Sequence, residues 1–155
     1  MPLGHLLRPS DESRVGAGDI ARIAVGVTGH RLERLAEYDL AALANRLADV
    51  MVSFERAASS DGLRLIGSLA EGADMIAADA AIARGWQLDT VLPFGRANYA
   101  DDFDRAGATD LRVRLDVSAN VFELPGSRDE PGGEAAAYER AGRVVLTQSD
   151  ILLAV

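Results

Sequence analysis

The stretch "ARIAVGVTGHR" (residues 21–31) joins a short, continuously apolar run to a polar turn. A β-branched apolar run of this length is typical of a strand that is buried on both faces. Parallel sheets are buried in this way when helices cover them, so the stretch predicts the first strand of an α/β domain. The turn Thr28-Gly29-His30-Arg31 is too polar for a core and is therefore a candidate for function.

The rest of the chain alternates helical and extended patterns. Apolar residues recur every three or four positions between Leu35 and Ser59, which predicts an amphipathic helix. Strands are also expected at 63–68, 86–94, 120–124 and 150–155, helices at 71–85 and 134–149, and short helical pieces within 96–117. Alternating strands and helices build βαβ units. The expected fold is therefore an α/β/α three-layer sandwich with a Rossmann-like, mainly parallel sheet of about five or more strands.

The two ends of the chain differ from its centre. Residues 1–19 are rich in Pro, Ser, Gly and charge and lack a signal-peptide pattern, so we expect a flexible leader before a domain at 20–155. The chain stops at Val155 inside an apolar strand, which suggests a domain truncated at its C-terminus. No apolar run approaches the ~20 residues of a spanning helix, so a cytoplasmic location is expected.

Composition narrows the possible chemistry. The 155 residues contain no cysteine, and all 16 basic side chains are arginines. These absences exclude thiolate chemistry, a Schiff-base lysine and the lysine of a P-loop. His5 and His30 are the only histidines, too few for a multi-histidine metal site. We expect no metal and no cofactor.

The charge balance narrows the possible partners. The formal net charge is −8, with 24 carboxylates and scattered arginines, whereas nucleic-acid binding needs clustered positive charge. Small anions remain compatible, because backbone amides and one or two arginines can hold a phosphate. We expect a small-molecule partner and no nucleic-acid or membrane partner. Homo-oligomers are common for sheets of this class, but no residue specifies one.

Polar segments that contain glycine follow three of the expected strands, at 28–31, 67–74 and 93–99. Ligands of open α/β sheets bind beyond the carboxyl ends of the strands, and these three segments lie at such ends. The candidate ligand-binding residues are Thr28, Gly29, His30, Arg31, Ser68, Glu71, Gly72, Pro93, Phe94 and Tyr99.

The second of these segments also has structural interpretations. Gly67 and Gly72 have the spacing of a P-loop, but Ala73-Asp74 stands where Lys-Ser/Thr is required. Gly72 could simply let a helix pack close to the sheet. Glu71 and Asp74 could complement the dipole at the start of that helix.

The first and third segments leave similar alternatives. A lone histidine such as His30 is more often a hydrogen-bonded loop residue than a catalyst, whereas the guanidinium of Arg31 suits bidentate contact with phosphate. Tyr99 could stack on a base or cover the edge of the core. A solvated helix face is the expected position of Asp101, Asp102 and Asp104.

Four segments together resemble the SLOG superfamily: "GVTGHR" (26–31), "GSLAEGAD" (67–74), "VLPFGRANYADDF" (91–103) and "AYERAGRVVLTQSDILLAV" (137–155). This superfamily comprises Rossmann-like domains, among them the DNA-processing protein DprA and the LOG-type cytokinin-activating phosphoribohydrolases. The second segment is similar to the SG-x-A-x-G-(I/A)-D turn of the DprA branch. The resemblance covers about residues 21–155.

The resemblance implies a nucleotide or nucleotide-derived ligand at the strand ends. It places Gly29, His30 and Arg31 in the first loop, Ser68, Glu71 and Gly72 in the second, and Pro93, Phe94 and Tyr99 in a wall of the pocket. A phosphate would rest on the amides of the Gly29 turn and of the helix start at Gly72, with Arg31 neutralising its charge. Many stand-alone members look like sensors, so binding or sensing is the leading expectation.

Two alternatives to ligand sensing stay open. One is a LOG-like phosphoribohydrolase that cleaves the N-glycosidic bond of a nucleoside monophosphate, with Glu71 as the catalytic acid or base. The Pro-Gly-Gly-x-Gly-Thr loop and catalytic glutamate of LOG enzymes would lie beyond Val155, and "PGG" at 131–133 lacks the following Gly-Thr. The other alternative is a structural or interaction domain that binds no ligand.

Overall fold

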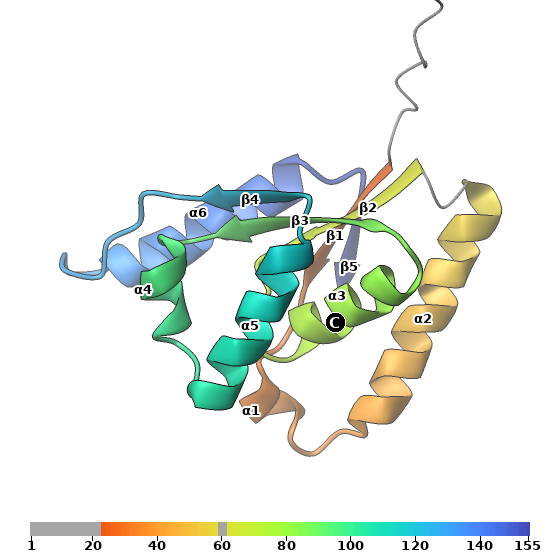
Figure 1. Cartoon of the computed structure of the whole chain (residues 1–155), viewed down its shortest axis with the longest axis horizontal. Helices are drawn as coiled ribbons and strands as arrows, with labels where there is room; N and C mark the ends of the chain where they lie inside the picture. The colour runs from red at the N-terminus through yellow and green to blue at the C-terminus, as the bar shows by residue number, and fades with distance from the viewer. Residues whose placement is uncertain (1–22, 59–61) are drawn as a thin grey trace, which may run out of the picture.

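The computed structural model describes residues 23–58 and 62–155, so the leader expected at 1–19 lies outside the described residues. Figure 1 shows one sheet with helices on both faces. Its strands are β1 (Ile23–Thr28), β2 (Leu63–Gly67), β3 (Gln87–Leu92), β4 (Asn120–Glu123) and β5 (Ile151–Ala154). All four pairings are parallel, in the order β4-β3-β2-β1-β5. The prediction of a Rossmann-like α/β/α sandwich is confirmed.

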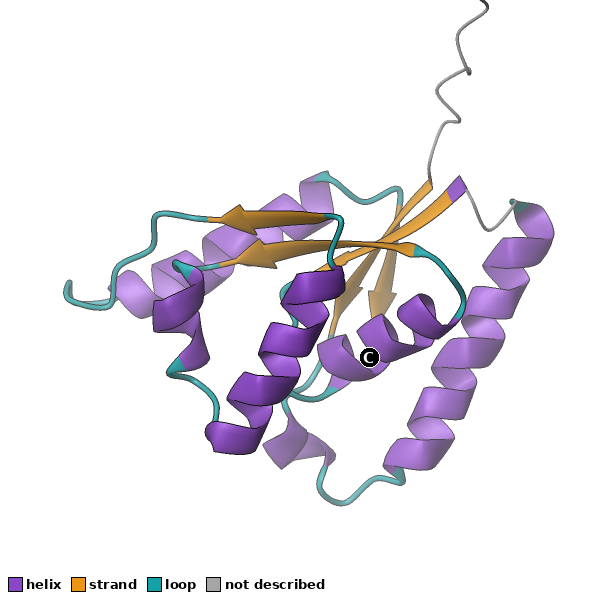
Figure 2. Ribbon diagram, in the orientation of Figure 1, coloured by secondary structure: helices purple, strands orange, loops and turns teal. Residues whose placement is uncertain are grey.

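Helices cover both faces of this sheet in the described part of the chain. They are α1 (Leu32–Leu35), α2 (Leu40–Ala57), α3 (Ala73–Ala83), α4 (Arg96–Ala100), α5 (Arg105–Val117) and α6 (Gly133–Thr147). Figure 2 shows α2, α3 and α5 on one side of the sheet and α6 on the other. No helix within 23–58 or 62–155 is long and apolar enough to cross a membrane.

The direction of the crossovers reverses between β1 and β5. From β1 the chain steps through β2 and β3 to β4, and α6 then carries it back to β5, on the other side of β1. Right-handed crossovers in opposite directions put their helices on opposite faces of a sheet. β1 and β5 are therefore neighbours whose connecting helices lie on opposite faces. A reversal of this kind is where α/β sheets bind ligands, at the carboxyl ends of the strands.

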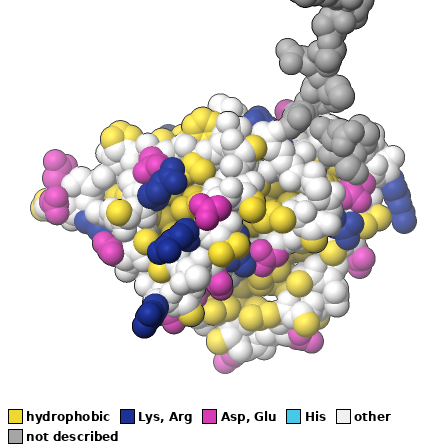
Figure 3. All heavy atoms as spheres, viewed as in Figure 1, with side chains coloured by type: hydrophobic (Ala, Val, Ile, Leu, Met, Phe, Trp, Pro, Cys, Tyr) yellow, Lys and Arg dark blue, Asp and Glu magenta, His cyan; other side chains and the backbone are white. Residues whose placement is uncertain are grey.

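An apolar layer on each face of the sheet holds the helices in place. In front, the fully buried Met51 of α2 and Ala77 of α3 belong to the larger core cluster. Behind, Val145 of α6 packs with Ile66 and Val91 of the sheet. Figure 3 shows the front face, where apolar side chains gather in a hollow between α2 and α5 and charged side chains surround it.

The single helix expected at 35–59 is wrong in its first turn. The side chain of Asp39 accepts hydrogen bonds from the amides of Ala41 and Ala42, at 3.0 and 3.1 Å, and so caps a helix that begins at Leu40. Leu35 belongs instead to the short α1. The sequence interpretation missed this break because Leu35 is apolar and buried like the helix residues, although it lies five residues before Leu40.

The region 96–117 is also more regular than expected. α5 runs for 13 residues, and Asp104 caps it by accepting a hydrogen bond from the amide of Gly107 at 2.8 Å. Asp104 therefore begins a helix and does not belong to a solvated helix face. Gly85 ends α3 as expected, at the position after the cap and with a φ of +74°.

Candidate functional site

The loops that follow β1 and β2 are joined to each other. The amide of Ala73 donates a hydrogen bond to the carbonyl of His30 at 3.2 Å, and Arg31 pairs with Gly72 in an isolated antiparallel bridge. Gly72 has a φ of +111°, and a Cβ there would lie 2.6 Å from the carbonyl oxygen of His30. The bridge therefore requires glycine at this position. Two of the three expected segments are thus brought into contact.

Gly29 allows the end of β1 to approach its neighbours closely. A Cβ at this position would lie 2.4 Å from the Cβ of Ala73 and 2.9 Å from the carbonyl oxygen of Val155. Contacts this short do not occur between real side chains and backbone, so a larger residue would push β1 away from α3 and β5. The glycine in this turn therefore has a packing role.

A pocket of about 360 Å³ opens at the carboxyl ends of β1 and β2, beside α6. Its volume lies within the range of small-molecule sites, roughly 300–1,000 Å³. Its polar lining consists of Thr28, Arg31, Ser68, Asp74, Tyr99 and Tyr138. Val27, Val145, Leu146 and Leu152 form its apolar lining, and Gly29, Ala70 and Gly142 complete it. The pocket brings five candidate residues together: Thr28, Gly29, Arg31, Ser68 and Tyr99.

Four other candidates do not line this pocket. Pro93 and Phe94 are buried in the core. Gly72 is the N-cap residue of α3. The carboxylate of Glu71 lies beside α5, since its Oε1 is 3.4 Å from the position that a Cβ on Gly107 would take. The residue expected to act as an acid or base is therefore directed toward a helix.

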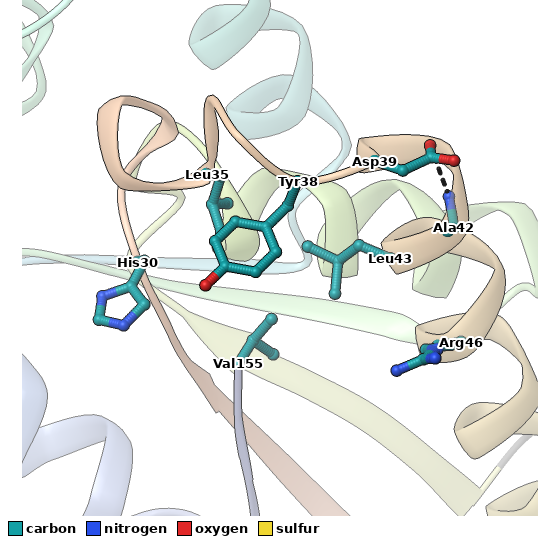
Figure 4. Close-up of a pocket in the computed structure, with 8 residues that line it drawn as sticks. All are labelled: His30, Leu35, Tyr38, Asp39, Ala42, Leu43, Arg46 and Val155. Carbon is teal, nitrogen blue, oxygen red and sulfur yellow. Dashed lines mark hydrogen bonds between the residues drawn. The ribbon is translucent and has the colours of Figure 1, made fainter.

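His30 lines a different pocket, of about 420 Å³. Figure 4 shows the side chains of His30, Tyr38 and Val155 around one part of it, with Arg46 of α2 further along. The lining comes from the loop after β1, from α1 and α2, and from the end of β5, so this pocket faces the α2 side of the sheet. His30 and Arg31 are adjacent in sequence but serve different pockets.

Asp74 is a buried carboxyl group in the wall of the first pocket. Its residue is 7% exposed, and Oδ2 accepts the amide of Ser68 at 3.2 Å. Burial raises the pKa of Asp74 to about 6, against the opposing influence of the Ser68 and Ala70 amides and of the Arg31 charge. Asp74 therefore links the start of α3 to the residue that follows β2, in addition to complementing the helix dipole.

The hydroxyl of Tyr99 is a second buried polar group in this wall. Tyr99 is fully buried, and no described residue offers its hydroxyl a hydrogen-bond partner. Its ring packs edge-on against Phe103, with the centroids 5.3 Å apart, so it covers the core. Burial raises the pKa of Tyr99, so the hydroxyl stays protonated and can donate a hydrogen bond to an acceptor. An unpaired buried hydroxyl costs about 1–3 kcal/mol, so an acceptor here would be stabilising.

Arg31 supplies the positive charge of the pocket and is held by two neighbours. Its guanidinium carbon lies 5.2 Å from the ring centroid of Tyr138, and Nη2 lies 3.9 Å from Asp102. The Tyr138 hydroxyl donates a hydrogen bond to Asp102, which also pairs with Arg128 at 2.5 Å. The Arg31 side chain is still 48% exposed, so it is oriented but accessible.

This network corrects the expectation for Asp102. Its side chain is only 11% exposed and is shared by two arginines and a tyrosine, so it does not lie on a solvated helix face. Arg128 in turn lies 4.1 Å from the ring centroid of Phe94 and pairs with Glu134 at 2.5 Å. The partners of Asp102 lie far from it in sequence, and no local pattern identified them.

Gly142 is a pocket residue that the sequence could have revealed. It lies in the interior of α6, where glycine costs a helix about 1 kcal/mol relative to alanine. A Cβ at this position would meet nothing within 4 Å. Neither backbone conformation nor packing requires the glycine, and its absent side chain leaves room beside the pocket. In the sequence, the glycine inside an otherwise helical pattern was the feature that could have indicated this position.

Two further results define what the site can be. Within the described ranges, no group of three or more His, Asp or Glu side chains is arranged to hold a metal ion. The chain matches no protein-family model and no curated protein. SLOG membership therefore stays a prediction from motifs, and function must be argued from the pocket itself.

Proposed function

We propose that this protein binds a small anionic ligand of the nucleotide type in the pocket at the carboxyl ends of β1 and β2. One observation carries the proposal: an accessible arginine and a buried, unpartnered hydroxyl line the same pocket. Arg31 provides the charge for an anion, and Tyr99 provides a hydrogen-bond donor that has no partner among residues 23–58 and 62–155. The position of the pocket, beside the point where the crossovers reverse, is where sheets of this class bind ligands.

Arg31 is the main contact for the anion in this proposal. The amide of Ala73, at the start of α3, already donates to the carbonyl of His30, and the amide of Ser68 already donates to Asp74. These two amides are therefore occupied, and the phosphate depends on the guanidinium. Tyr138 and Asp102 orient that guanidinium before any ligand arrives, which lowers the entropic cost of binding.

The apolar side of the pocket suits the less polar part of such a ligand. Val145 and Leu146 of α6 and Leu152 of β5 contribute this side, and Gly142 adds no side chain that would narrow it. A planar ring system such as a base buries its faces well against aliphatic side chains of this kind. The pocket thus offers charge at Arg31 and apolar surface along α6.

The proposal assigns no reaction to the pocket. The hydrolytic alternative depends on Glu71, whose carboxylate lies beside α5 and is not part of the pocket lining. An acid or base must reach the reacting atom within about 2.6–3.2 Å. Release of free base from a nucleoside monophosphate by the purified protein would support the hydrolytic alternative.

A thermal-shift panel tests the proposal. Nucleoside mono-, di- and triphosphates, ADP-ribose and cyclic dinucleotides are tested against the wild type, Arg31→Ala and Arg34→Ala. A ligand at 100 times its Kd stabilises the folded state by about 2.7 kcal/mol, so a bound nucleotide raises Tm. Arg31→Ala should abolish this rise. The matched control, Arg34→Ala, removes the same charge from exposed α1 and should keep it.

Two outcomes would contradict the proposal. A wild type that no compound stabilises would favour an interaction domain without a ligand. A shift that both arginine variants retain would show that the ligand binds outside the Arg31 pocket.

A further inference from the structure

The charge of Arg31 accounts for an anion but leaves Tyr99 without a role. Most buried polar groups in folded proteins have a hydrogen-bond partner, so one that lacks it requires an explanation. The Tyr99 hydroxyl is buried, has no partner among the described residues, and belongs to a side chain of the pocket wall. Its ring contacts, 5.3 Å to Phe103 and 6.5 Å to Tyr138 between centroids, would be equally available to phenylalanine.

We infer that Tyr99 is a specificity-determining residue: its hydroxyl donates a hydrogen bond to an uncharged acceptor on the ligand whose anionic group contacts Arg31. The acceptor is a carbonyl oxygen, a hydroxyl oxygen or a ring nitrogen. The inference rests on the proposed function. It narrows the ligand class to molecules that carry a neutral acceptor close to the anionic group, and it separates them from simple inorganic anions.

The charges around Tyr99 explain why the acceptor is uncharged. The pocket holds one carboxyl group in its wall, Asp74, and a second, Asp102, lies behind Arg31. Among the described residues that line the pocket, Arg31 is the one cation, and it already faces Asp102. A second negative charge beside Tyr99 would be repelled by the carboxylates and would gain no further cation. A neutral acceptor avoids this repulsion and still satisfies the hydroxyl.

The energetics make the inference testable in the absence of ligand. Phenylalanine in place of Tyr99 keeps the ring packing and removes a buried group that lacks a protein partner. When the removed polar group has no partner, its loss is neutral or stabilising for the folded state. When it has one, its loss leaves that partner unsatisfied and destabilises the protein. The sign of the stability change therefore reports whether the hydroxyl is already satisfied inside the protein.

The experiment uses the variant Tyr99→Phe, with adenosine 5′-monophosphate and inorganic phosphate as probes. Urea denaturation without ligand should show an unfolding free energy equal to or above that of the wild type. Calorimetry should show that affinity for adenosine 5′-monophosphate falls about three- to tenfold, the value of one neutral hydrogen bond. Affinity for inorganic phosphate should not change, because phosphate needs only Arg31.

The control is Tyr38→Phe, which makes the same change at an exposed tyrosine in the other pocket. It should leave stability and both affinities unchanged. If wild type binds adenosine 5′-monophosphate and Tyr99→Phe binds it equally well, the inference fails while the proposed function stands. If Tyr99→Phe lowers stability, the hydroxyl has a structural partner such as a bound water, and the inference also fails. If wild type binds neither probe, the proposed function and the inference fail together.

Discussion

Asp74 accepts the backbone amide of Ser68 at 3.2 Å while remaining only 7% exposed. Loops between a strand and a helix in α/β proteins often use such amides to hold an external anion. Here an internal carboxyl group takes that position. The pocket wall therefore contains a group that titrates in a physiological range, and this has consequences for stability.

The free energy of unfolding should fall as the pH rises through about 6, because of Asp74. The ordinary pKa of an aspartate is 3.8, and burial raises the pKa of Asp74 to about 6 in the fold, so the folded protein holds the proton more tightly. The resulting stabilisation is fully present below pH 3.8 and is lost as the pH rises through 6. A shift of this size corresponds to about 3 kcal/mol. Asp74→Asn should remove this pH dependence, as measured by urea denaturation between pH 4 and 8.

The control for this measurement is Asp101→Asn, which changes an exposed carboxyl group at the C-cap of α4. It should follow the wild-type pH profile. Wild type and Asp74→Asn profiles that run parallel from pH 4 to 8 would show that Asp74 is ionised throughout.

Bulk at Gly142 should block the pocket without unfolding α6. Gly142→Ala should raise the free energy of unfolding by up to about 1 kcal/mol, because its Cβ meets open space and alanine favours a helix. Gly142→Leu should leave stability unchanged or higher and abolish the nucleotide-induced rise in Tm. Ala135→Leu adds bulk on an exposed part of α6 and should leave that rise intact. If Gly142→Leu keeps the full nucleotide-induced rise in Tm, the ligand binds outside this pocket.

Asp102 should control affinity through the position of Arg31. Asp102→Asn removes the charge that Arg31, Arg128 and the Tyr138 hydroxyl share. We expect the free energy of unfolding to fall by about 1–3 kcal/mol, the cost of losing hydrogen bonds to a charged group. The Tm rise with nucleotide should shrink as well. Glu134→Gln, which touches Arg128 but not Arg31, should keep the ligand response. If Asp102→Asn and Glu134→Gln show the same nucleotide-induced rise in Tm, Asp102 has no role in ligand binding.

The sheet contains a buried ion pair whose loss should be severe. Asp89 of β3 is fully buried and binds Arg64 at 2.8 Å, Gln87 at 2.9 Å and Asn120 at 2.8 Å. Asp89→Ala should lower the free energy of unfolding by about 3–5 kcal/mol, because it strands a partly buried guanidinium. Urea denaturation measures this directly. The double variant Asp89→Leu with Arg64→Met should recover much of the loss, and a double variant as unstable as Asp89→Ala would contradict the charge explanation.

Part of the pocket lining could be predicted from the sequence, for a geometric reason. Residues after neighbouring parallel strands share one edge of the sheet, so Arg31, Ser68 and Tyr99 lie in one pocket although they come from three segments. The same reasoning could not separate His30 from Arg31. Adjacent residues of a turn point in different directions, and only the bridge to Gly72 fixes which pocket each one lines.

The sequence by itself predicted the strands, the longer helices and the fold class, because apolar periodicity and glycine stops act over a few residues. It did not predict the helix starts that Asp39 and Asp104 cap. The tertiary structure alone decided which carboxyl group enters the pocket. Glu71 and Asp74 lie three residues apart in one segment, yet the positive φ of Gly72 turns the chain between them. Asp74 consequently faces Ser68 and the pocket, while Glu71 faces α5. That choice depends on contacts between segments distant in the chain, which no local pattern records.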